Sequence, residues 1–217
     1  MGIGRKSGDR RVILFGFPHC GDFSESYQAW SDGLPASMRF HGVELLQTGM
    51  SMREVHSDRW EQGLQEACSF VQRHLVPNEE YVFIGHCWGS LLAFEASHRM
   101  RGAGLAEPSH LFLSGCSAPH TLRSRSEAGG LQGSDSGCQP MGEYRPPVDL
   151  QQLRSRISVF TGNKDEHAMI DQLAEWSRYT SKICDVHVCE GNHAFWQAHA
   201  IKWLQVAQTI VEREYVI

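Results

Sequence analysis

The sequence of 217 residues lacks the features that mark several broad classes of protein. No apolar run approaches the roughly 18 residues needed to cross a membrane, and no charged-then-apolar signal peptide opens the chain. Basic residues are not clustered and the formal net charge is −5, so we expect neither nucleic acid nor a membrane as a partner. The chain has no Cys-x-x-Cys and no His-Glu-x-x-His motif, and we therefore predict no metal site.

The chain holds seven cysteines, an odd number, and no secretory signal is recognisable. This favours reduced thiols and a cytoplasmic location over a framework of disulfides. A hydrophobic content of 41% suits a globular protein with a full core, and no linker divides the sequence into two distinct halves. We therefore predict a single domain over residues 1–217.

Apolar runs and helical patterns alternate along most of the chain. Compact apolar runs predict strands over residues 11–17, 38–46, 81–84, 110–114, 157–160 and 183–189. Helical spacing predicts helices after Ser24 and over residues 55–75, 90–96, 169–179 and 195–211. Such alternation is typical of an α/β fold with a mainly parallel sheet flanked by helices. Residues 117–147 have no apolar periodicity, and we predict a short irregular insert there.

The pentapeptide Gly-His-Cys-Trp-Gly at residues 85–89 stands between a predicted strand and a predicted helix. Strand, Gly-x-nucleophile-x-Gly, helix is the context of a nucleophile elbow, a sharp reversal that presents a reactive side chain. Glycines flank the centre because larger side chains would clash with the helix and the sheet. The usual centre is serine. Here it is Cys87, which we interpret as a thiol nucleophile, with simple packing in the core as the alternative.

Two further polar residues follow later strands, at the edge of the sheet where functional residues gather. Asp165 comes just after one predicted strand, and His193 comes just after the last. The order nucleophile, acid, histidine is that of the α/β-hydrolases, in which histidine takes the proton of the nucleophile and the acid orients the imidazole. Glu166 and Asp149 are alternative acids. The sequence therefore predicts a triad of Cys87, His193 and Asp165.

Two backbone N–H groups are expected to stabilise the oxyanion of an acyl intermediate. One is predicted to come from Trp88 and the other from Cys20, in the turn after the first strand. Substrate contacts are predicted for the residues beside these groups: His19, Gly21, His86, Trp88 and Phe195. Packing is the alternative role for His86 and for the Trp88 side chain, and orientation of a neighbour is the alternative for His19.

Several short motifs occur in order along nearly the whole chain: residues 17–21, Tyr27 with Trp30, the elbow, and residues 117–120, 162–165 and 191–195. Together they resemble the type II thioesterases that accompany nonribosomal peptide and polyketide synthases. The resemblance implies an α/β-hydrolase fold with no cofactor of its own. It also implies an acyl substrate held as a thioester on the phosphopantetheine arm of an acyl or peptidyl carrier protein. The chain departs from this family in its elbow cysteine and in its short insert, which indicates a reduced lid.

The elbow cysteine leaves more than one reaction open. Attack by a hydroxyl on a thioester gives an ester, whereas attack by Cys87 gives another thioester that keeps its acyl-transfer potential. We predict hydrolysis, as in an editing type II thioesterase, with transfer to a second thiol or amine, or cyclase-like release, as the alternative. An inactive module that binds a carrier or synthase is a third hypothesis, and a broken triad would mark it. The short lid favours a small or aminoacyl-like group over a fatty one.

Overall fold

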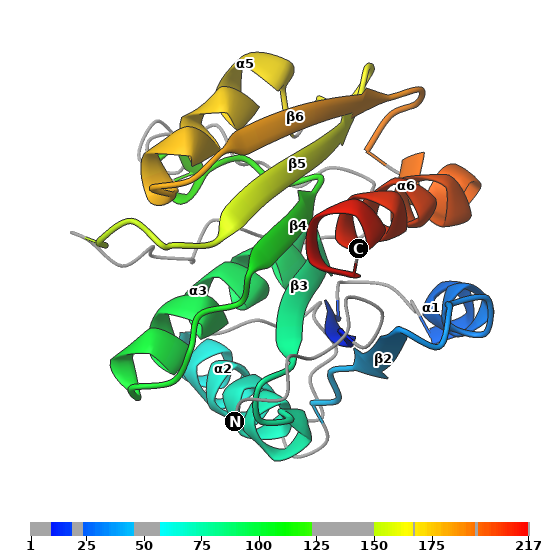
Figure 1. The fold of residues 1–217 in the computed structure, drawn as a ribbon. Helices are drawn as coiled ribbons and strands as arrows, with labels where there is room; N and C mark the ends of the chain where they lie inside the picture. The colour runs from blue at the N-terminus through cyan, green and yellow to red at the C-terminus, as the bar shows by residue number, and fades with distance from the viewer. Residues whose placement is uncertain are drawn as a thin grey trace.

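A computed structural model describes residues 10–18, 24–45, 57–122, 150–166, 168–193 and 195–216. Six strands form one sheet in the order β2-β1-β3-β4-β5-β6 (Figure 1). Their bounds are β1 (Val12–Phe17), β2 (Met38–Gly42), β3 (Glu80–His86), β4 (His110–Ser114), β5 (Arg156–Gly162) and β6 (Cys184–Cys189). Every neighbouring pair is parallel, which confirms the predicted α/β sheet.

Helices cover the sheet on both faces. The α-helices are α1 (Ser24–Ser31), α2 (Ser57–His74), α3 (Trp88–Gly102), α5 (Ile170–Leu173) and α6 (Phe195–Val211). Figure 1 shows α2 and α3 on one side of the sheet and α1 and α6 on the other. A π-helix, Glu212–Val216, continues α6. No helix among the described residues combines the length and the apolar character needed to cross a membrane.

The alternation of side chains along each strand divides the core into two clusters. In β1, Ile13, Phe15 and Phe17 join the cluster beneath α2 and α3. Val12 and Leu14 point the other way and join the cluster beneath α1 and α6. All five are fully buried, because a parallel strand between two helical layers has no face in water. This is why β1 reads as an unbroken apolar run in the sequence, whereas the edge strands β2 and β6 are partly exposed and include polar residues.

The predicted helix over residues 169–179 is different in the structure. Only Ile170–Leu173 is α-helical, and Ala174–Tyr179 forms a 3-10 helix. A 3-10 helix places residues three apart on one side. Trp176 and Tyr179 are three apart, and their rings pack edge-on against Phe94 of α3 at 5.2 and 5.1 Å. The tighter winding therefore follows from tertiary packing that the sequence pattern does not reveal.

The insert predicted over residues 117–147 lies mostly outside the described residues. Its first part is described, and residues 119–122 are helical. His120 joins this segment to the 3-10 helix: its ring nitrogens lie 3.0 Å from the Tyr179 hydroxyl and 3.0 Å from a carboxylate oxygen of Glu175. These contacts give His120 a supporting role in this segment. The reduced lid itself remains a prediction.

A buried histidine marks the amino edge of the sheet. His110 opens β4 with no exposed surface, stacks on Phe112 at 4.0 Å between ring centroids, and lies 2.8 Å from the Ser158 hydroxyl. Its other nitrogen lies 3.2 Å from the hydroxyl of Tyr215, in the π-helix. Burial, with a smaller effect of the nearby Arg156 and His187, lowers the pKa of His110 to about 3. The imidazole is therefore neutral in the folded protein at neutral pH.

This histidine should make the fold sensitive to acid. The pKa in the unfolded chain is about 6.5, so as pH falls below that value the unfolded state binds a proton that the folded state excludes until about pH 3. The free energy of unfolding should therefore fall as pH falls from about 6.5 toward 4. We expect His110→Gln to be less stable at pH 7 but to show a shallower slope over this range, measured by urea unfolding at a series of pH values. His187 is only half-buried, so His187→Gln should change the slope less than His110→Gln does. An unchanged slope in His110→Gln would show that His110 is not the source of the acid sensitivity.

Candidate active site

The turn between β3 and α3 has the geometry of a nucleophile elbow. Cys87 lies at its tip with φ 51° and ψ −118°. Residues other than glycine rarely adopt such a positive φ. A Cβ on Gly85 would clash with the carbonyl oxygen of Gly89. A Cβ on Gly89 would lie 2.7 Å from the carbonyl oxygen of Pro18, at the end of β1. Both flanking glycines are therefore required by close backbone approach, and the strain is concentrated at Cys87.

Hydrogen bonds to β4 and β3 fix this strained turn. The Cys87 amide donates to the Ser114 carbonyl at 2.7 Å. The hydroxyl of Ser90 lies 3.0 Å from the carbonyl oxygens of both Gly85 and Ser114, and it accepts from the Ser114 amide at 3.0 Å. Ser90 thus ties the first turn of α3 to two strands. The sequence analysis missed this residue, because a serine in a helical run carries no distinctive signal.

The loops after β5 and β6 bring a carboxylate and an imidazole together. His193 Nδ1 lies 3.0 Å from Asp165 Oδ2 and 3.2 Å from Oδ1. The Asp165 side chain has no exposed surface, and its oxygens also accept from the Ala168 amide at 3.0 Å and the Thr161 hydroxyl at 3.4 Å. The carboxylate is therefore held from several sides, and it is Asp165 rather than Glu166 that contacts the imidazole. The other candidate acid, Asp149, lies outside the described residues.

Close contact between these two loops sets their positions. A Cβ on Gly162 would clash with the carbonyl oxygen of Gly191, so the backbones touch at this point. The Asn163 side chain accepts from the Gly191 amide at 3.0 Å, and the Lys164 amide donates to the Gly191 carbonyl at 2.8 Å. The Gly-Asn-Lys-Asp and Gly-Asn-His motifs therefore act as one unit. Because Nδ1 faces Asp165, Nε2 is the nitrogen of His193 that can exchange a proton with a nucleophile.

His193 lies beside the elbow. Its ring centroid is 5.4 Å from that of His86, the residue immediately before Cys87. Gly115, with φ 57°, fits between them: a Cβ there would lie 2.6 Å from His86 Cε1 and 3.2 Å from His193 Cε1. His86 is anchored to the Ser114 hydroxyl at 3.0 Å. The structure thus gathers Cys87, His193 and Asp165 at the carboxyl edge of the sheet, and Gly115 is a second residue that the sequence analysis missed.

We expect Gly115→Ala to impair activity more than stability. The left-handed φ and the displaced His86 ring should cost about 1–3 kcal/mol in the free energy of unfolding. A shift of His193 by about 1 Å should lower kcat by about 100-fold. Thermal melting and a turnover assay would measure the two effects. Gly102→Ala is the matched control, because Gly102 ends α3 in open space and its replacement should leave activity unchanged.

The segment that carries the elbow is shared with a known family of proteins. The family model described as Thioesterase domain matches residues 12–136, more than half of the chain. The chain belongs to the thioesterase family. The matched segment includes β1 and the elbow and ends before Asp165 and His193, so the family assignment does not depend on these two residues.

Relatives and solved structures agree with this assignment. This thioesterase is 29% identical over 217 residues to the gramicidin S biosynthesis protein GrsT of Aneurinibacillus migulanus, over 85% of this chain and 83% of that protein. It is 27% identical over 150 residues to the probable anguibactin biosynthesis thioesterase AngT of Vibrio anguillarum, over 54% of this chain and 59% of that protein. ClbQ from the colibactin NRPS/PKS pathway superposes with a TM-score of 0.75 at 18% identity, over 94% of this chain and 98% of that chain.

A further solved structure, RedJ, the thioesterase from the prodiginine biosynthetic pathway in Streptomyces coelicolor, superposes with a TM-score of 0.70 at 23% identity. The superposition covers 93% of this chain and 90% of the RedJ chain. These likenesses confirm the predicted α/β-hydrolase fold. The resemblance to type II thioesterases seen in the sequence motifs is confirmed as well.

The remaining predicted site residues divide into buried groups and groups outside the described residues. His86 and Phe195 are each 1% exposed, and their rings pack edge-on at 6.0 Å between centroids. This gives both a packing role, and a contact with substrate remains a prediction. His19, Cys20 and Gly21 lie outside the described residues, so the second oxyanion donor also remains a prediction.

Cys116, which follows β4 near the elbow, does not compete with Cys87 as the nucleophile. No disulfide is formed among the five described cysteines. Cys116 has no exposed surface, and burial together with the nearby Asp165 carboxylate raises the pKa of its thiol. Its carbonyl accepts from the Trp176 indole at 2.9 Å. Cys116 is therefore a packed structural residue.

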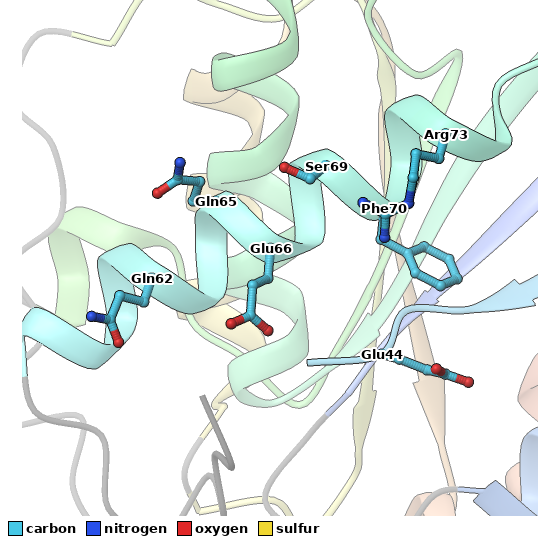
Figure 2. Close-up of a pocket in the computed structure, with 7 residues that line it drawn as sticks. All are labelled: Glu44, Gln62, Gln65, Glu66, Ser69, Phe70 and Arg73. Atoms are coloured by element: carbon cyan, nitrogen blue, oxygen red, sulfur yellow. The ribbon is translucent and has the colours of Figure 1, made fainter. Parts of the chain in front are cut away.

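The thioesterase has a hollow of about 530 Å³ beside α2, away from the residues of the elbow and the triad (Figure 2). It is lined by Glu44, Gln62, Gln65, Glu66, Ser69, Phe70 and Arg73. Apart from Phe70 these side chains are polar or charged, which does not suit the apolar part of an acyl chain. Among the described residues, no group of three or more His, Cys, Asp or Glu side chains is placed to hold a metal ion.

Proposed function

We propose that this thioesterase takes an acyl group from the phosphopantetheine thioester of a carrier protein onto Cys87 and releases it by hydrolysis. The observation that carries the proposal is the His193–Asp165 pair beside a cysteine at a strained elbow. Relatives named for gramicidin S and anguibactin biosynthesis support a type II thioesterase of a nonribosomal peptide or polyketide pathway. The proposed partner is therefore an acyl or peptidyl carrier protein, and the protein needs no cofactor of its own.

The first half of the reaction forms an acyl-enzyme. His193 takes the proton of the Cys87 thiol, and the thiolate, at the N-terminus of α3, attacks the carbonyl carbon of the substrate. Asp165 holds the Nδ1–H and stabilises the imidazolium. The Trp88 amide and the proposed Cys20 amide stabilise the oxyanion. Collapse breaks the bond to the phosphopantetheine sulfur, which leaves as a thiol with the proton from His193, and Cys87 carries the acyl group.

The second half decides between hydrolysis and transfer. In hydrolysis His193 deprotonates water, the hydroxide attacks the Cys87 thioester, and the free acid leaves while the proton returns to the Cys87 sulfur. In transfer a second thiol or an amine replaces water. The identity of Cys87 favours this second candidate, because exchange between two thioesters is nearly isoenergetic and keeps the acyl group activated. Family membership favours hydrolysis.

The products from an acyl-loaded carrier separate the two reactions. Purified protein would be mixed with a loaded carrier and an unloaded second carrier, and intact masses would be followed over time. We expect an acyl adduct on Cys87, free acid and unloaded carriers. Acyl groups that appear on the second carrier without free acid would overturn hydrolysis in favour of transfer. If none of the loaded carriers tested gives an adduct or turnover, the result would favour the hypothesis of an inactive module that binds a carrier or synthase.

The variant Cys87→Ser tests why cysteine is present. An oxygen ester on the introduced serine no longer exchanges with thiols near equilibrium, so any transfer activity should be lost. Hydrolysis should persist at a reduced rate, because the serine hydroxyl needs more activation by His193 than a thiol does. Free acid and transferred acyl groups would be measured in the same assay. Transfer at the parental rate by Cys87→Ser would contradict this account.

A further inference from the structure

Two tryptophans meet beside the nucleophile. Trp88 is the first residue of α3, directly after Cys87, and Trp60 lies in the first turn of α2. Both helices lie on the same face of the sheet (Figure 1). The rings of the two tryptophans pack at 5.3 Å between centroids, with an angle of 54° between their planes. Trp88 is 1% exposed and Trp60 is 9% exposed. An aromatic pair therefore fills the space between the two helices at the end nearest to Cys87.

A buried carboxylate holds this pair in place. Glu95 of α3 is 7% exposed and accepts a hydrogen bond from the Trp60 indole N–H at 3.2 Å. Glu95 follows Trp88 by seven residues, two helical turns, so both project from the same side of α3. The bond fixes the plane of the Trp60 ring, and Trp60 in turn packs against Trp88. A hydrogen bond inside the core has a preferred geometry, so it resists rearrangement more than apolar packing alone.

The position of Cys87 means that this aromatic pair affects which acyl groups fit on its sulfur. The Cys87 side chain is 1% exposed and packs in the same cluster as Trp60 and Trp88. Protein interiors are close-packed, so an acyl chain that extends from the Cys87 sulfur toward α2 and α3 meets these rings rather than open space. Leucine or methionine at position 88 would leave much more room than an indole. The large side chain after the nucleophile is thus placed to restrict the acyl group.

We propose that Trp88, backed by Trp60 and oriented through Glu95, limits the acyl groups accepted on Cys87 to short ones such as acetyl, butyryl or a small aminoacyl group. This inference rests on the proposed function, because it describes the substrate of the same site. Trp88 and Trp60 determine specificity, and Glu95 is a positioning residue that acts through Trp60. Long fatty acyl groups are excluded because the indole pair occupies the space between α2 and α3 into which such a chain would extend.

The first test compares carriers loaded with acetyl, butyryl, octanoyl and dodecanoyl groups. We expect the parent to favour acetyl and butyryl over octanoyl in kcat/KM by about tenfold or more, and Trp88→Met to shift the ratio toward octanoyl by about tenfold or more. Trp60→Leu and Glu95→Leu should shift it in the same direction, whereas Glu95→Gln, which keeps an acceptor for the indole, should not. The control is Trp203→Phe in α6, on the other face of the sheet. Trp88→Phe replaces Trp88→Met if the latter does not fold.

The second test reads access to Cys87 without turnover. N-alkyl bromoacetamides of increasing chain length alkylate the thiolate with loss of bromide, and the labelled peptide identifies Cys87. The parent should react more slowly as the chain lengthens, and Trp88→Met should remove this dependence. Rates independent of chain length in the parent, or unchanged in folded Trp88 variants, overturn the inference. A shifted alkylation profile without turnover of any loaded carrier would instead support the size limit and overturn the proposed function.

Discussion

The Cys87→Ala variant is expected to lose acyl-thioester turnover by about 10⁴-fold or more while it keeps its fold. The sulfur is the only group removed, and it is the atom on which the acyl intermediate is proposed to form. Alanine meets the same positive φ as cysteine, so the elbow gains no additional backbone strain. The hydrogen bond from the residue 87 amide to the Ser114 carbonyl is retained. Steady-state hydrolysis and thermal melting would measure the two quantities together.

A matched control separates the nucleophile from buried cysteines in general. Cys68 in α2 is 8% exposed, and burial raises the pKa of its thiol to about 11, so it is a poor nucleophile at neutral pH. Cys68→Ala should therefore retain activity. In intact-mass experiments the acyl adduct should be absent from Cys87→Ala and present in Cys68→Ala. Substantial turnover by Cys87→Ala in a folded protein would show that the reaction does not use this sulfur.

Much of the fold follows from the sequence because burial on both faces leaves a strong pattern. β1 and residues 81–84 of β3 are apolar, since consecutive side chains enter the two core clusters on opposite sides of the sheet. The weaker case is Ala174–Tyr179. There the apolar spacing permits an α-helix, and the contacts of Trp176 and Tyr179 with Phe94 select the 3-10 form. Local periodicity does not contain that information.

The same distinction applies to the site. The residues of the predicted triad carry a signal in the chain, because each follows directly on a strand and they occur in a known order. Gly115 and Ser90 carry none, since their roles depend on the register of two strands. β3 pairs with β4 so that His86 stands opposite Ser114. That register places Gly115 against the His86 ring, and it brings the Ser90 hydroxyl to the Ser114 backbone. Only the assembled sheet reveals these neighbours.

The second large effect is expected from the proton-transfer pair. His193→Ala should lower kcat by about 10³- to 10⁴-fold, because His193 is the group proposed to take the thiol proton and return it to the leaving group. The residual activity should rise with pH, because hydroxide in the solvent then takes the thiol proton in place of His193. Asp165→Asn should cost less, about 10- to 100-fold, since a thiolate depends less on an oriented imidazole than an alkoxide, for which loss of the acid costs about 10⁴-fold.

A histidine outside the site makes this comparison sharp. His187 in β6 stacks on Phe160 at 4.6 Å and has no part in the proposed proton transfer, so His187→Gln should keep the parental pH–rate profile. The pattern to be measured is kcat against pH for all three variants, with folding checked by thermal melting. A severe loss in His193→Ala together with a milder loss in Asp165→Asn is expected only if His193 is a base that contacts both the acid and the nucleophile. If folded His193→Ala kept the parental activity, His193 could not be the base of the reaction. Equal losses in the two variants would instead show that Cys87 needs an oriented imidazole as much as a serine does.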